Sequence, residues 1–302
     1  MATRRTGGES ATGGRVAALT VALCLVAACR WGANNPANTE KELAGVGYSR
    51  QLVALIQALQ NHRSIATAFV DGDTSVDFAT PEEHIASQYV IVNRFDLQHG
   101  ELDGARQRWT PLGKDILALM DSWREQPREC FRRHTDSIAA ALALLAHIND
   151  ASTLGSDTAA DIHSLADAAT NAIPNLTEIM AQTRDLVSSM AGQAAVVRDE
   201  EHQLFGRHLA NIRKYADQIK SDYEAAYAVD AGIRSQLEPQ REQVSQVMAP
   251  VLDRLEHKVL ESDYVKMTPD DWTPKATLSV ESIQTLHEQA LTVLQARLTA
   301  RK

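Results

Sequence analysis

The chain has 302 residues, of which 44% are hydrophobic, 23% are charged and only 5% are aromatic, and its formal net charge is −9. This composition excludes a chain that is disordered throughout, and the length suits one large or two small domains. Without the first 28 residues, which hold three arginines and one glutamate, 27 basic residues face 38 acidic ones and the net charge is −11. Because so acidic a surface repels phosphate backbones, we expect no nucleic-acid partner.

The N-terminal segment predicts export and lipidation. The run Val16–Ala28 carries no charge and follows three arginines, which is typical of an export signal and too short to span a bilayer. It ends in Val26-Ala27-Ala28-Cys29, which resembles the lipobox of bacterial lipoproteins, where the leader is cut and the cysteine is acylated. We therefore expect an export signal over 1–28, a lipidated (palmitate-type) Cys29 and a flexible tether over 29–38. An uncleaved signal anchor, or cleavage a few residues later, is the alternative.

Lipidation would place the protein in the bacterial cell envelope, anchored to a membrane and facing the extracytoplasmic side. It would also leave Cys130 alone in the mature chain, because Cys24 lies in the leader, so no intramolecular disulfide could form. A lone cysteine of this kind is more often a small buried hydrophobe than a reactive thiol.

Four helices are expected in the first half of the chain. Thr39-Glu40-Lys41-Glu42 and Thr80-Pro81-Glu82-Glu83 both have the spacing of a capping box, which predicts a helix start. Pro111 should lie near the start of the third helix or kink it, and Pro127 should introduce the fourth. The four predicted segments end at a loop over 149–157 and cover residues 39–71, 80–99, 109–123 and 127–148.

Four more helices are expected in the second half. The first begins near Thr158, is interrupted at Pro174 and ends at Gly192. The next has a heptad seam from Phe205 to Ala226, which indicates internal core or helix association. Pro239 and Pro250 should bend or re-cap the one that follows. The apolar positions of these last three helices lie in 205–226, 233–251 and 280–298.

No segment alternates with the period of a strand, so the fold class is all-α, an up-down arrangement of about eight helices that favours two four-helix bundles, with halves 39–150 and 151–302. Known catalytic and nucleotide-binding motifs are absent, and we predict that the protein is not an enzyme and needs no cofactor. His202 and His208 would lie on different helix faces, so no metal site is expected. His287 falls in an apolar stripe, which favours a hydrogen-bonded core histidine.

Two arginines are expected to point into helix interfaces. Arg63 continues the apolar face of Leu52, Ile56 and Leu59, with His62 beside it, and Arg184 lies between two apolar residues at the same spacing. A buried guanidinium without a partner is costly. The partner could be a carboxylate of a neighbouring helix or a bound anion, and spacing favours the carboxylate; the anion would make Arg63, Arg184 and His62 ligand-binding residues.

The segments 55–66 and 173–184 around these residues resemble the extracytoplasmic helical sensor domains of the nitrate- and nitrite-sensing (NIT) type, found in bacterial chemoreceptors, histidine kinases and diguanylate cyclases. The resemblance spans about Tyr48 to Arg301. It implies a helical bundle that binds a small ligand between helices, with Arg63 and Arg184 at anion-gripping positions, and it leaves a homodimer open. Ser64 departs from the family, which usually has glycine there. The family also continues into a second membrane helix and an output domain, which we do not find in this chain.

We therefore expect a sensory-type lipoprotein that captures a small anion such as nitrate or nitrite and acts through a membrane receptor or kinase. The alternative is a structural or adaptor lipoprotein without a small-molecule ligand.

Overall fold

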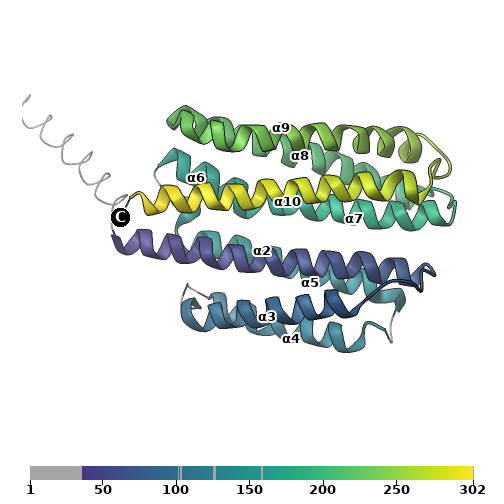
Figure 1. Ribbon diagram of the computed structural model, residues 1–302, viewed down its shortest axis with the longest axis horizontal. Coiled ribbons are helices and arrows are strands. Elements are labelled where there is room, and N and C mark those ends of the chain that lie inside the picture. Colours follow the sequence, from purple (N-terminus) through teal and green to yellow (C-terminus); the bar gives the residue numbers. More distant parts are fainter. Residues whose placement is uncertain (1–35, 101, 103, 125–126, 158, 302) are drawn as a thin grey trace, which may run out of the picture.

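The computed structural model describes residues 36–100, 102, 104–124, 127–157 and 159–301, and these residues form an elongated stack of antiparallel helices (Figure 1). The predicted all-α class is confirmed. None of the described helices contains a stretch long and apolar enough to cross a bilayer. The export signal, Cys29 and most of the expected tether lie outside the described residues.

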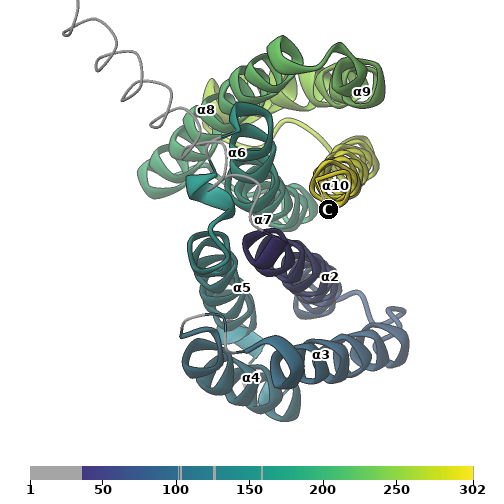
Figure 2. The same ribbon diagram turned by 90° about the vertical axis from the view of Figure 1, so that its left-hand side faces the viewer.

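The first half of the chain forms a four-helix bundle, which we call the first bundle. Its helices are α2 (Pro36–Val70), α3 (Ala79–His99), α4 (Ala105–Ser122) and α5 (Pro127–Ala151), and α2 packs against both α3 and α5. Helix α2 has 35 residues, which corresponds to a length of about 52 Å. Both α2 and α5 also contact elements of the second half, so these two helices join the halves (Figure 2).

The second half forms a second bundle. Its α-helices are α6 (Ala160–Asp167), α7 (Ile173–Gly192), α8 (Asp199–Val229), α9 (Ala231–Leu255) and α10 (Pro269–Thr299), with a short 3₁₀ turn η1 (Leu154–Ser156) and π-helical turns η2 (Ala168–Ala172) and η3 (Glu256–Leu260). Helices α6 and α7 are continuous through η2 and together count as one helical segment. The described residues therefore contain the eight helical segments expected. The seam of α8 is internal core, since all its members are buried except the half-buried Ala216.

Several boundaries differ from those expected. Helix α2 begins at Pro36, inside the predicted tether, and the supposed capping box lies within the helix with Thr39 and Glu42 buried. Helix α5 extends to Ala151, into the expected loop. Helix α9 is continuous through Pro239 and Pro250, so neither proline ends it. The start of α5 at Pro127 agrees with the expected one. Helix α10 begins at Pro269 with Thr268 as its N-cap, before the apolar positions 280–298 that marked it in the sequence.

Pro174 widens its helix where we expected an interruption. A proline has no N–H to donate to the carbonyl one turn earlier and clashes with that turn, and the π-helical turn η2 directly precedes it. In π-helical register the carbonyl left without a donor is that of Ala169. The Nε2 of His287 on α10 lies 2.5 Å from this oxygen and donates to it. The prediction that His287 is a hydrogen-bonded core histidine is confirmed.

Candidate functional site

Arg63 and Arg184, which were expected to point into helix interfaces, both lie at the interface between α2 and α7. The Arg63 side chain is 0% exposed and the Arg184 side chain 9%. Arg63 Nη1 donates to Glu178 Oε1 at 2.6 Å, and Arg63 Nε donates to Asp185 Oδ2 at 3.1 Å. Arg184 Nε donates to the other oxygen of Asp185, at 2.8 Å. We call these four residues the central cluster: Arg63, Glu178, Arg184 and Asp185.

The central cluster is balanced, with two guanidinium groups and two carboxylates. Burial alone would lower the pKa of Arg63, but the attraction of Glu178 and Asp185 outweighs it and the pKa is raised. Of the two partners that the sequence left open for Arg63, the structure shows the carboxylate. Arg184 is less completely satisfied, since its Nη2 lies 2.8 Å from Asp185 Oδ1 without the alignment of a hydrogen bond. A ligand-binding role for Arg63, Arg184 and His62 stays a prediction.

His62 lies apart from Arg63, in the first bundle. Its Nδ1 is 2.7 Å from His134 Nε2, and the His134 Nδ1 lies 2.8 Å from the carbonyl of Cys130. Because a carbonyl only accepts, His134 Nδ1 carries the proton, and in the neutral pair His62 Nδ1 must donate to His134 Nε2. Burial lowers the pKa of His62 to about 4 and that of His134 to about 3. The pair is therefore neutral at pH 7.

Cys130 behaves as a buried hydrophobe. Its side chain packs against Trp123 and Leu119, and burial raises the pKa of its thiol to about 11. A thiol in this state is almost entirely protonated at neutral pH and is a poor nucleophile.

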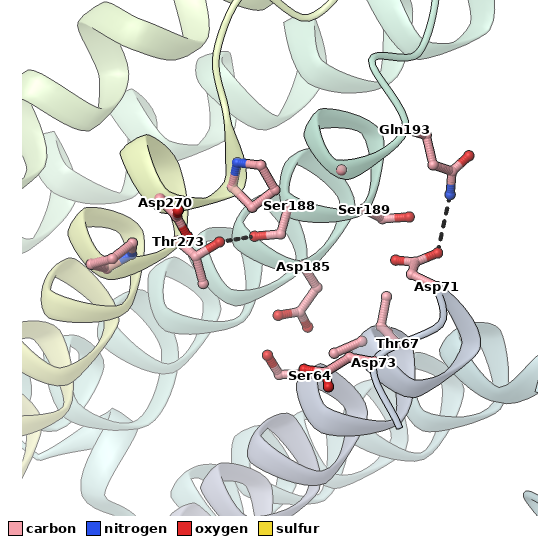
Figure 3. Close-up of a pocket in the computed structure, with 14 residues that line it drawn as sticks. Ser64, Thr67, Asp71, Asp73, Asp185, Ser188, Ser189, Gln193, Asp270 and Thr273 are labelled. Carbon is pink, nitrogen blue, oxygen red and sulfur yellow. Dashed lines mark hydrogen bonds between the residues drawn. The ribbon is translucent and has the colours of Figure 1, made fainter. Parts of the chain in front are cut away.

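The candidate ligand site is a cavity of about 470 Å³ where the last turns of α2 and α7 meet the first turns of α10 (Figure 3). The buried Asp185 lines it, and Asp71, Asp73 and Asp270 lie on its exposed rim. Hydroxyl groups cover much of the wall, and Ser188 is bonded to Thr273 at 2.8 Å across the α7–α10 interface. The remaining lining residues are Ser64, Thr67, Ala68, Ser189, Gly192, Gln193, Pro269 and Pro274.

The lining is acidic and contains no lysine, arginine or histidine. Two helices, α2 and α7, end at the cavity, and the C-terminal end of a helix carries partial negative charge. The N-terminus of α10 contributes the opposite sign. The net chemistry of the cavity is therefore that of acceptor groups for a cation or for a molecule rich in hydrogen-bond donors.

Sequence reasoning placed the arginines correctly but did not find the cavity. Arg63 and Arg184 are not among its lining residues, whereas Ser64, the departure from the resembled family, is. The rim aspartates lie in the segments Asp71-Gly72-Asp73 and Thr268-Pro269-Asp270-Asp271, whose residue types indicate a helix break and a turn and not a binding site. Both segments line the cavity because α2 ends and α10 begins beside the last turns of α7.

Groups of three or more potential metal ligands are absent from the described residues.

No protein-family model matches the sequence, and no curated protein matches it. The solved structure of the NasR transcription antiterminator is similar, with a TM-score of 0.62 and 14% sequence identity over 93% of this chain and 75% of that one. At this identity the likeness concerns the fold alone. The chain therefore has an all-helical fold of the kind that the NasR transcription antiterminator also has.

Proposed function

We propose that this chain is a ligand-binding module of the helical-sensor type, whose cavity between α2, α7 and α10 takes a small polar molecule with a positive charge, and that it acts through a partner protein. The observation that carries the proposal is the cavity itself: it has room for a small molecule, four aspartates line it, and no basic side chain does. A primary ammonium group with an adjacent hydroxyl matches this lining, since carboxylates and hydroxyls accept its N–H and O–H donors.

Asp185 links the cavity to the helix interface. Its carboxylate lines the cavity and also holds Arg63 of α2 and Arg184 of α7. A cationic ligand would compete with both guanidinium groups for Asp185, while Arg63 would keep Glu178. Occupancy would therefore shift the balance of the contacts between α2 and α7, which is the kind of differential interaction that a sensor requires.

The experiment is a thermal-shift titration of the full chain with ethanolammonium chloride, against sodium chloride at equal ionic strength. We expect stabilisation by the amine that grows with its concentration. Asp270→Asn should weaken binding by roughly tenfold, because one rim carboxylate is lost. Glu281→Gln, an exposed neutralisation elsewhere on α10, is the matched control and should bind normally. The absence of any shift across a panel of small amines would overturn the cationic assignment.

A small anion such as nitrate or nitrite is the second candidate. The Nη2 of Arg184, which is buried and lacks an aligned hydrogen bond, favours it, as does the family resemblance at Arg63 and Arg184. An anion would have to displace Asp185 from the guanidinium groups, which is costly. The same titration with sodium nitrate tests it, and stabilisation that disappears in Arg184→Gln would support it. If neither ligand class shifts the transition, the structural or adaptor role is the better account.

The lipid anchor and the envelope location are further parts of this proposal. They rest on the sequence around Cys29 alone. Labelling cells with an alkyne analogue of palmitate tests them, and labelling that persists in Cys29→Ala would contradict the anchor at this position.

A further inference from the structure

The beginning of α2 and the end of α10 lie side by side at one end of the molecule (Figure 1). Three charged side chains meet there: Glu42 of α2, Asp157 of the segment between η1 and α6, and Arg301, just beyond α10. Arg301 Nη1 donates to Asp157 Oδ2 at 2.6 Å and lies 3.8 Å from Glu42 Oε2. Both carboxyl side chains are nearly inaccessible, at 6% exposed for Glu42 and 2% for Asp157.

In the described part of this end of the molecule, two buried carboxyl groups lie beside only one guanidinium group that is free to pair with them. Glu42 and Asp157 share one guanidinium group, since the neighbouring Arg297 is already bonded to Asp161 at 2.7 Å and to Asp230 at 2.6 Å. The Oε2 atom of Glu42 is buried and has no hydrogen-bond partner among the described residues. Two buried carboxylates beside one cation leave a negative charge uncompensated, and retention of a proton on one of them removes it.

The proton resides on Glu42. Burial, followed by the negative charge of Asp157, raises the pKa of Glu42 to about 7, although Arg301 opposes the shift. Burial would also raise the pKa of Asp157, but hydrogen bonds from Arg301 and from the Ala159 amide outweigh it and the pKa is lowered. Below about pH 7 the pair therefore consists mainly of one neutral acid, Glu42, and one carboxylate, Asp157.

We propose that Glu42, Asp157 and Arg301 form a proton-operated latch, which holds the start of α2 against the end of α10 while Glu42 is protonated and loosens when it ionises. The latch is independent of the ligand proposed above, because the cavity lies at the opposite end of α2. It would make the packing of α2 against the end of α10 respond to the pH outside the cell if the chain is exported as the sequence predicts.

The sign of the effect follows from the raised pKa. The folded chain keeps the Glu42 proton up to about pH 7, whereas in a loosened end the carboxyl titrates at its ordinary value of 4.5. The closed state therefore weakens as the pH rises through this window, and between pH 6 and pH 8.5 the closed-to-open ratio should fall about tenfold.

Amide hydrogen exchange of the full chain tests this directly, with protection factors that correct for the intrinsic pH dependence. In the wild type, residues 40–46 should lose protection about tenfold between pH 6 and pH 8.5. Glu42→Gln, which mimics the protonated acid, should keep its protection at both pH values, and the exposed control Glu281→Gln should behave as the wild type. If Glu42→Gln did not fold, Asp157→Asn should abolish the same pH dependence, because Glu42 would then pair with Arg301. An equal loss of protection in the wild type and in the variant that folds would overturn the latch.

Discussion

Two buried ionic clusters hold different parts of α2 against the second bundle, and they differ in net charge. The central cluster has two guanidinium groups for two carboxylates, and each carboxylate accepts a bond from an arginine. The latch has one guanidinium group for two carboxyl side chains, those of Glu42 and Asp157. Because an uncompensated buried charge is costly, the unbalanced cluster retains a proton, whereas in the balanced cluster each carboxylate has a guanidinium partner. Charge balance, more than burial, decides which of them responds to pH.

Breaking the balance of the central cluster should have the largest effect. Arg63→Met leaves Glu178 without its guanidinium partner in an interface that excludes water, and we expect a loss of about 3–5 kcal/mol in the free energy of unfolding. Urea unfolding measures it. The control is Arg132→Met, whose side chain is 63% exposed and whose two ion pairs lie on the surface, and it should change stability by less than about 0.5 kcal/mol.

A second substitution distinguishes the effect of charge balance on stability from the effect of lost packing. Adding Glu178→Gln to Arg63→Met removes the stranded charge, so part of the lost stability should return even though another hydrogen bond is lost. A double variant that is less stable than the single one by the full cost of Glu178→Gln alone would show that charge balance is unimportant here.

The neutral His62–His134 pair also makes the free energy of unfolding depend on pH, but in the opposite direction: its contribution is lost as the pH falls. In the unfolded chain a histidine gains its proton near pH 6.5, whereas burial lowers the pKa of the folded His62 to about 4. The contribution of neutral His62 is thus complete above pH 6.5 and is lost as the pH falls through 4. We expect His62 alone to make the free energy of unfolding about 2–3 kcal/mol lower at pH 4.5 than at pH 7. His62→Leu should reduce this slope, and replacing the exposed His257 by asparagine should not.

An uncharged buried contact gives the next largest effect. His287→Leu removes the donor to the Ala169 carbonyl, and an unsatisfied buried carbonyl costs about 1–3 kcal/mol. Pro174→Ala restores a backbone N–H at the position that lacks one. The double variant should therefore lose less stability than the sum of the two single variants. Strict additivity in a thermal-unfolding cycle would contradict the role that we assign to His287.

The smallest expected effect is at a second pair with excess acid, Asp167 and Asp222. Burial, followed by the charge of Asp167, raises the pKa of Asp222 to about 7, so its contribution is complete below its ordinary pKa and is lost as the pH rises through 7. The side chain is only half-buried, and we expect Asp222→Asn to raise the free energy of unfolding at pH 8 by about 1 kcal/mol. Asp217→Asn on the same helix is the control. No gain over this control would limit the comparison to fully buried acids.

Local sequence signals predicted most of the fold and less of the site. Pro127 gave the start of α5, and the Thr80-Pro81 pair gave that of α3 to within one residue, because a proline without an N–H is tolerated in the first turn of a helix. The same logic failed at Thr39, where a sequence with the spacing of a capping box lies inside α2. It also failed at Pro174, because a donor from α10 compensates the proline, and nothing near Pro174 in the sequence announces His287.

The sequence by itself determined the all-helical class, the succession of helices and the burial of Arg63 and Arg184, because each follows from the spacing of apolar residues along one helix. Only the tertiary structure decided what those arginines face, where a cavity opens and which carboxyl keeps its proton. These depend on side chains from helices more than a hundred residues apart, such as Arg63 with Asp185 or Glu42 with Arg301, and on how much water their packing excludes. Helix periodicity says which face is buried, but the identity of the facing residue is set by the packing of one helix on another.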